Sequence, residues 1–185
     1  MGRRVGVIAP LTALVIGLAT PTGALQESSP GSSALAAVAS ACPGATAAAG
    51  DTQSTLESMY CGINVVRHSY GLRAVRGNGT LNRSSALKAN AVRRCGFTHT
   101  PCGMAWSATF RRAGYLPARA IGENLAFGQG ELGTPVSILR MWLNSSAHRA
   151  NLLARRWRDL GIAFERGHMF GMDGVTLWVM QVGCR

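Results

Sequence analysis

The spacing of apolar residues beyond residue 50 predicts four helices. In the first segment, residues 56–70, apolar side chains recur three or four residues apart. Gly71 follows at the position where a left-handed cap ends a helix. The second predicted helix, residues 81–95, is rich in small side chains, which favour close helix packing. Thr134 and Pro135 open the fourth with a capping hydroxyl and a proline at the first helical position. The helices are expected over residues 56–70, 81–95, 107–113 and 135–144.

Two later segments have the nearly continuous apolar runs that are typical of buried strands. Residues 160–164 and 175–182 are joined by the glycine-rich loop 167–174, which predicts an antiparallel hairpin. Residues 73–75 predict a short edge strand before a turn at 77–79. Helices on both faces of a small sheet would bury these strands completely. The pattern therefore predicts an α+β fold, an α-β-α sandwich in which a small antiparallel sheet is flanked by helices.

Residues 1–24 have the pattern of a signal peptide. Two arginines precede an uncharged apolar run over residues 5–19, and small residues then lead to a cleavage site after Ala24. The run is too short to span a bilayer comfortably. We therefore expect a secreted, extracellular chain that is not an integral membrane protein. Ala39-Ser40-Ala41-Cys42 faintly resembles a lipoprotein acceptor, but it lies far from the apolar run, so lipid anchoring at Cys42 is not predicted.

The composition divides the remaining chain into two parts. Residues 25–50 are almost wholly Ala, Ser, Gly and Pro, which bury little surface and so cannot offset their own ordering entropy. They are predicted to form a linker. Residues 51–185 have the size of one domain with one core, and we expect a monomer.

The chain has five cysteines, and disulfides are expected among them because an exported chain matures in an oxidising compartment. Joining Cys42 to Cys61 would tie the end of the linker to the first helix. Joining Cys95 to Cys102 would clamp the short loop between them and leave Cys184 over. A bond between Cys102 and Cys184 is an open alternative, because sequence alone does not fix connectivity.

The formal net charge of +11 comes almost entirely from arginine, with Lys88 the only lysine. Such an excess predicts attraction to anionic surfaces such as cell-envelope polymers or lipid head groups, or alternatively a solvated arginine-rich surface. Aromatic residues are not interleaved with the arginines as a single-strand binder requires, so a specific nucleic-acid partner is not predicted.

Three residues are candidates for chemistry. Glu123 is one of few acids in a basic chain, His148 follows the fourth helix, and His99 lies in a predicted loop, where functional residues concentrate. Each also has a structural interpretation. Glu123 could accept backbone hydrogen bonds in a Gly-Glu-Asn turn, His148 could pin the segment after the helix, and His99 could be a solvent-exposed loop residue. His68 and His168 are expected to be exposed.

The order of several short motifs resembles the CAP superfamily, which includes cysteine-rich secretory proteins, antigen 5 and plant pathogenesis-related proteins and is also called the SCP domain. The chain looks like its small bacterial extracellular branch, and the match covers about residues 55–185. The motifs are Cys61-Gly62-Ile63-Asn64, Phe97-Thr98-His99-Thr100, Gly114-Tyr115, Gly122-Glu123-Asn124-Leu125-Ala126, Trp142-Leu143-Asn144-Ser145-Ser146-Ala147-His148-Arg149-Ala150-Asn151-Leu152-Leu153 and a closing strand that ends in Gln181.

The resemblance implies an α-β-α sandwich with a cleft that in several family members binds a divalent cation such as zinc. Carried over by position, His99, Glu123 and His148 match the histidines and the acid of that cleft. Ser145 stands where animal and plant members have a second acid, and Trp178 where they have a second histidine. The set is therefore incomplete.

Two imidazoles and one carboxylate are still the ligand set of many catalytic zinc centres, with a fourth position open to water. The local spacing His-Glu-x-x-His is missing, so only the fold would bring the three residues together. The sequence therefore predicts a secreted binding module whose cleft holds a divalent cation and a small-molecule, lipid or anionic cell-envelope ligand. The alternative function is a metal-dependent, peptidase-like extracellular hydrolase.

Overall fold

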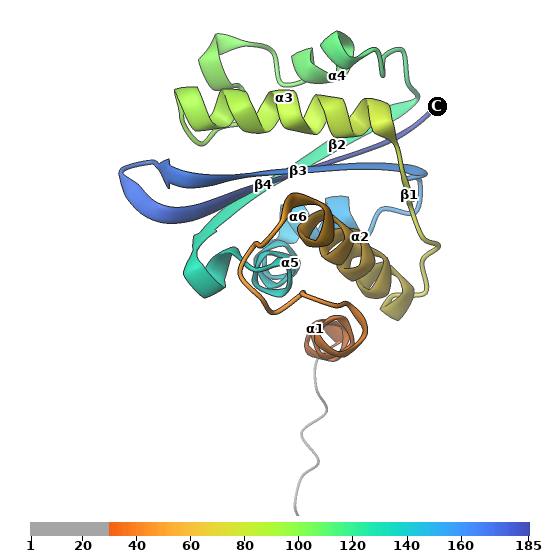
Figure 1. Ribbon diagram of the computed structural model, residues 1–185. Coiled ribbons are helices and arrows are strands. Elements are labelled where there is room, and N and C mark those ends of the chain that lie inside the picture. Colours follow the sequence, from red (N-terminus) through yellow and green to blue (C-terminus); the bar gives the residue numbers. More distant parts are fainter. Residues whose placement is uncertain (1–29) are drawn as a thin grey trace, which may run out of the picture.

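A computed structural model of the protein describes residues 30–185. The predicted signal peptide, residues 1–24, lies outside the described residues. A four-stranded sheet forms the centre of the described chain, with the strand order β1-β3-β4-β2 (Figure 1). Strands β2 and β3 both pair antiparallel with β4, whereas β1 pairs parallel with β3, so the sheet is mixed. The strands are β1 (Arg76–Gly77), β2 (Ala120–Gln129), β3 (Asp159–Met169) and β4 (Met172–Cys184).

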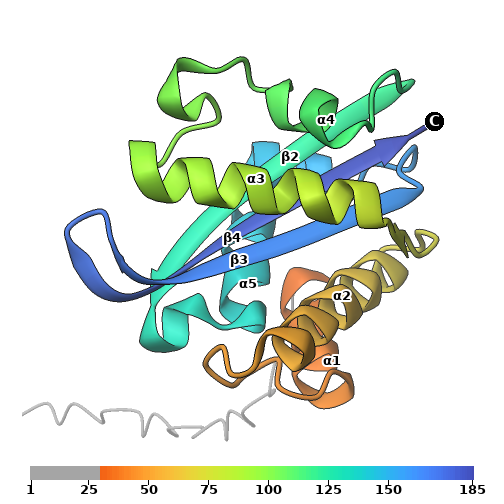
Figure 2. The same cartoon turned by 45° about the horizontal axis from the view of Figure 1, so that its top comes forward.

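Helices cover both faces of this sheet and form two outer layers (Figure 1). Helices α3 and α4 lie on one face, and Figure 2 shows α3 running across the strands of that face. The other helices of the described chain lie on the opposite side. This arrangement confirms the predicted α-β-α sandwich. The helices are α1 (Pro30–Ala41), α2 (Thr52–Ser69), α3 (Gly79–Cys95), α4 (Ala108–Ala113), α5 (Pro135–Asn144) and α6 (Ser146–Leu152), with 3-10 turns at η1 (Pro101–Gly103) and η2 (Gly130–Gly133).

Side-chain caps explain where the main helices begin. Asp51 accepts a hydrogen bond from the Ser54 amide at the start of α2, and Thr134 accepts one from the Ser137 amide at the start of α5. The predicted turn at residues 77–79 caps the helix that follows it, because Asn78 accepts hydrogen bonds from the Thr80 and Leu81 amides that open α3. The four helices predicted from spacing are confirmed. Their ends agree with the prediction to within two residues, except that α2 begins four residues earlier than expected, at Thr52.

The segment predicted as a linker is structured over much of its length. Residues 30–41 form α1, whose Ala34, Leu35 and Val38 are buried in the main core against α2 and α5. The linker prediction is wrong for this part of the segment, because it assumed that a stretch of mostly small residues buries too little surface to fold. A helix with few but aligned apolar residues can still pack, and the Cys42–Cys61 disulfide fastens its end to α2.

The strand predictions were partly wrong. The Gly-Glu-Asn segment was expected in a turn, but it lies within β2, a ten-residue strand that pairs with β4 along its whole length. The edge strand expected at residues 73–75 lies instead at 76–77. The predicted hairpin is confirmed with longer strands, and its turn is Phe170-Gly171, both with positive φ as such tight turns require.

Both first-choice disulfides, Cys42–Cys61 and Cys95–Cys102, are present. Cys184 is a partly exposed free thiol, so the alternative pairing of Cys102 with Cys184 is wrong. Within residues 30–185, no helix combines the length and the apolar character needed to cross a membrane.

Candidate ligand-binding cleft

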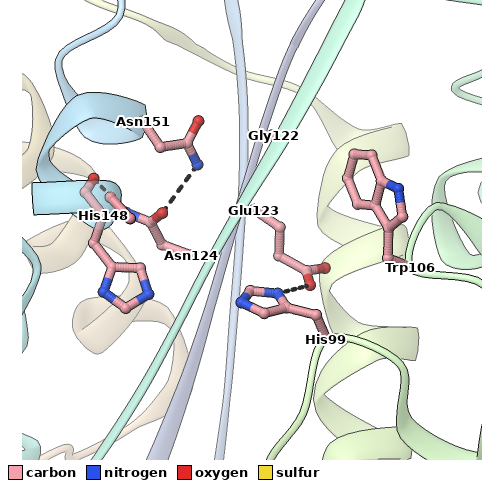
Figure 3. Close-up of a pocket in the computed structure, with 8 residues that line it drawn as sticks. His99, Trp106, Gly122, Glu123, Asn124, His148 and Asn151 are labelled. Atoms are coloured by element: carbon pink, nitrogen blue, oxygen red, sulfur yellow. Dashed lines mark hydrogen bonds and ion pairs between the residues drawn. The ribbon is translucent and has the colours of Figure 1, made fainter. Parts of the chain in front are cut away.

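A pocket of about 300 Å³ opens beside β2 (Figure 3). Among the described residues, β2 is an edge strand of the sheet, with β4 on one side and no strand on the other. The lining of the pocket draws on β2, on α6 and on the loop between α3 and α4. It therefore lies between the two helical layers. The lining residues are His99, Trp106, Gly122, Glu123, Asn124, Ala147, His148 and Asn151.

Because β2 is pleated, its polar side chains reach both walls of the pocket. Successive side chains of a strand point to opposite faces of its sheet. Glu123 therefore points toward α3, and Asn124 points toward α6, as Figure 3 shows. One edge strand thus supplies a carboxylate to one wall and an amide to the other.

Glu123 is buried and has both carboxylate oxygens engaged. Its side chain is 1% exposed, and its Oε1 lies 2.8 Å from His99 Nδ1 and 3.3 Å from Lys88 Nζ. Gln181 Nε2 donates to Oε2 over 2.7 Å from the adjacent strand β4. The carboxylate is therefore held by donors from three separate segments rather than by the amides of its own backbone.

The contact with Glu123 orients the His99 ring. A carboxylate only accepts hydrogen bonds, so Nδ1 carries the proton, and in the neutral ring Nε2 keeps a free lone pair. Figure 3 shows Nε2 turned toward the side of the pocket that holds His148. His99 is half exposed, and its loop is clamped by the Cys95–Cys102 disulfide. The imidazole is thus held at Nδ1 by Glu123, and its Nε2 is accessible from the pocket.

The opposite wall is held by an amide pair. Asn124 Nδ2 donates to the backbone carbonyl of His148 over 3.0 Å, and Asn151 Nδ2 donates to Asn124 Oδ1 over 2.9 Å. These bonds fix α6 against β2. Gly122 permits the close approach, because a Cβ there would lie 2.4 Å from Asn151 Oδ1 and 2.9 Å from the Trp157 ring.

The pKa of His148 lies below its ordinary value, first because burial disfavours the charged ring and second because His99 is close by. A histidine with a lowered pKa is largely neutral at neutral pH, and a neutral imidazole has a lone pair for a ligand. His148 can therefore offer a lone pair to a bound group, as Nε2 of the neutral His99 ring also can.

The three predicted site residues line one pocket, but they do not form one set of metal ligands. Among residues 30–185, no group of three His, Cys, Asp or Glu side chains is placed to hold a single metal ion. Glu123 fits poorly as a ligand because an ammonium and an amide already occupy its oxygens. The two imidazoles fit a cation better, and Glu123 then resembles the carboxylate that orients a metal-binding histidine from behind.

The other residues considered from the sequence do not line this pocket. His68 and His168 are exposed, as predicted, and His168 bonds Asp173 in the β3–β4 hairpin. Trp178 is buried and donates its ring N–H to the Gly133 carbonyl, so it is part of the core. Ser145 lines a neighbouring groove rather than the pocket.

Two residues of the cleft were missed from the sequence. Lys88 was expected only as one position along a helix, and Trp106 lay in an unassigned loop. For Lys88 a signal was available, because it is the chain's only lysine and lies among the small residues of a buried helix face. For Trp106 we find no comparable signal.

Comparison with protein families gives one assignment. The family model described as the cysteine-rich secretory protein family, CAP, matches residues 62–182, about two thirds of the chain. The uncharacterized protein YkwD of Bacillus subtilis (strain 168) is 24% identical over 119 residues, which are 64% of this chain and 42% of that protein. The chain therefore spans less than half the length of this curated relative.

Solved structures show the same fold. An outer surface protein from Borrelia burgdorferi superposes with a TM-score of 0.61 and 21% identity, over 73% of this chain and 96% of that one. An extracellular protein containing a SCP domain from Bacillus anthracis str. Ames gives a TM-score of 0.60 and 18% identity, over 72% and 41% of the two chains. At these identities the likeness establishes the fold alone.

Proposed function

Because this chain belongs to the cysteine-rich secretory protein family, we propose that it is an extracellular binding module that holds a ligand between His99 and His148. The observation that carries the proposal is the pair of imidazoles facing one pocket from two independently fixed walls. The two disulfides support an oxidising, extracellular location. Such a prearranged pair lowers the entropy cost of binding a small polar group.

Within this proposal, a divalent cation such as zinc is held by His99 and His148. Neutral imidazole is a good zinc ligand, and the bound cation would supply Lewis acidity to whatever group completes its coordination. Glu123 orients His99 and does not coordinate. Two protein donors make a weak site, so we expect zinc affinity well below that of a structural zinc centre with four protein ligands.

An adjoining apolar groove supports a ligand with an apolar part. His148 also lines this second hollow of about 280 Å³, so the groove begins where the polar cleft ends. A single-chain amphiphile could place its polar end between the imidazoles and its chain in the groove. The groove is lined by Phe97, Leu125, Ala126, Phe127, Met141, Trp142 and Ser145 together with His148.

We favour binding over hydrolysis because of Glu123. A metal-dependent hydrolase needs a general base within reach of the attacking water. Among the described residues, Glu123 is the only carboxylate lining the pocket, and both of its oxygens are already engaged. In our proposal this residue positions His99 and takes no proton from a substrate.

Calorimetry with zinc tests the cation site. We expect wild-type protein to bind zinc, and both His99→Ala and His148→Ala to lose at least tenfold in affinity, which corresponds to about 1.4 kcal/mol. His168→Ala is the matched control, because its exposed imidazole also has a carboxylate partner. Equal binding by all four proteins would refute the cation site.

Binding of dodecanoate, a simple amphiphile, tests the groove. Met141→Lys places a charge in the groove and should abolish dodecanoate binding while zinc binding persists. Leu87→Lys is the control, because Leu87 is an exposed leucine on α3, outside the groove. A zinc-loaded protein that hydrolyses a peptide, with activity lost in His148→Ala but not in His168→Ala, would instead favour the hydrolase.

A further inference from the structure

Lys88 is the only lysine in the sequence, and it is fully buried. Its ammonium group has three protons and three acceptors within reach. Nζ lies 2.7 Å from the carbonyl oxygen of His99, 3.0 Å from that of Trp106 and 3.3 Å from Glu123 Oε1. The buried ammonium thus donates hydrogen bonds to two backbone carbonyls and forms an ion pair with the carboxylate.

These three acceptors belong to the parts of the chain that form one wall of the cleft. Glu123 comes from β2, whereas His99 and Trp106 come from the loop between α3 and α4. The Cys95–Cys102 disulfide closes only the first part of that loop, and Trp106 lies beyond it. Lys88 is therefore the residue that links the backbone of His99, the backbone of Trp106 and the carboxylate.

We infer that Lys88 is a positioning residue for the cleft, which places the His99 imidazole and the Trp106 indole relative to Glu123. Its action is indirect, because the side chain itself does not line the pocket. The ammonium holds the two loop carbonyls in place and supplies the positive charge that compensates the buried carboxylate. Glu123 in turn orients the His99 ring through Nδ1.

The three acceptors surround a single nitrogen, which suits lysine better than arginine. Small side chains such as Ser84, Ser85 and Ala89 form the buried face beside Lys88. A slim stem with a compact ammonium fits there, whereas the planar guanidinium is larger and presents its donors as a fork.

This role goes beyond ligand binding, but its value to the protein rests on the proposed function. The test therefore uses two readouts that need no ligand. Amide hydrogen exchange reports how firmly residues 97–106 are held, and the ¹⁵N spectrum of the His99 ring reports which nitrogen carries the proton. Failure of ligand binding and failure of the positioning role are thus distinguishable.

The experiment compares wild type with Lys88→Met, which keeps the stem and removes the charge. We expect exchange in residues 97–106 to rise about tenfold more than exchange in the sheet, and the His99 ring to lose its Nδ1–H preference. Ser84→Ala is the matched control, because Ser84 is also buried on this face of α3 and its hydroxyl makes no hydrogen bond.

Lys88→Gln is the second variant, because it retains donors for the carbonyls and should fold if Lys88→Met does not. We expect it to hold the loop partly but to lose the His99 tautomer preference. The inference is overturned if the substitutions lower the melting temperature while loop exchange rises only in step with the sheet and the His99 tautomer is unchanged. Lys88 would then stabilise the fold without positioning the cleft.

Discussion

Lys88 Nζ and Glu123 Oε1 lie 3.3 Å apart, and neither side chain has appreciable contact with solvent. The pair joins the helix on one face of the sheet to the edge strand that forms the floor of the cleft. Because both charges are buried, each depends on the other for compensation. The stability of the domain and the geometry of the proposed binding site therefore share one interaction.

Replacing Glu123 with glutamine should destabilise the protein strongly. The substitution leaves the ammonium of Lys88 buried without a counter-charge, and breaking a buried pair in this way costs about 3–5 kcal/mol. Denaturant unfolding measures the loss. Glu165→Gln is the control, because Glu165 pairs with Arg93 at 3.5 Å in a more exposed position and should cost less than about 1 kcal/mol. Similar losses from both substitutions would contradict the buried-pair account.

The stability of the domain should fall as the pH drops below about 6.5, the ordinary pKa of histidine. Folding lowers the pKa of His148, so the unfolded chain takes up its proton first. The stabilising contribution is complete above the unfolded pKa and is lost as the pH falls toward the folded one. Melting temperatures between pH 7.5 and 5 measure this slope, and His148→Gln should reduce it. An unchanged slope in the variant would assign the effect to other groups.

Leu35→Ala should cost about 2–3 kcal/mol of unfolding free energy if α1 belongs to the domain. Leu35 is 9% exposed and packs in the main core, whereas a leucine in a true linker would contribute almost nothing. Leu132→Ala is the matched control, because Leu132 is 62% exposed and should cost less than about 0.5 kcal/mol. Equal effects would restore the linker interpretation of residues 25–50.

Gly161→Ala should destabilise the protein by about 3 kcal/mol, because the added methyl group would collide with the backbone of Leu81. The collision would push α3 away from the sheet and so disturb Lys88. Gly79→Ala provides the comparison, since a Cβ there meets nothing within 4 Å, and should change stability by about 0.5 kcal/mol or less. Circular dichroism melts of the two variants give the difference.

The sequence predicts those parts of the fold in which local spacing and burial agree. Helix α5 was predicted with the bounds it has, because Thr134 and Pro135 mark its start and its apolar face is regular. Strand β2 was missed because its buried positions include Glu123 and Asn124, two residue types that are depleted in strands, and asparagine is also favoured in turns. Their burial depends on partners from distant parts of the chain.

The same limit applies to the site. His99, Glu123 and His148 could be chosen from their residue types and family position, and they do share a pocket. The sequence could not show that Glu123 is already engaged by Lys88 and Gln181, because those contacts join three different elements. Our proposal that Glu123 orients His99 instead of binding the cation rests on these tertiary contacts alone.

The most direct test of the central claim is a zinc titration of protein labelled with ¹⁵N-histidine, which resolves each of the four imidazoles. We predict that the ring signals of His99 and His148 shift together at one zinc equivalent, while those of His68 and His168 do not. The Nδ1–H signal of His99 should persist, because Glu123 holds that proton. Independent shifts of His99 and His148, or shifts at His68 and His168 alone, would contradict a shared binding site.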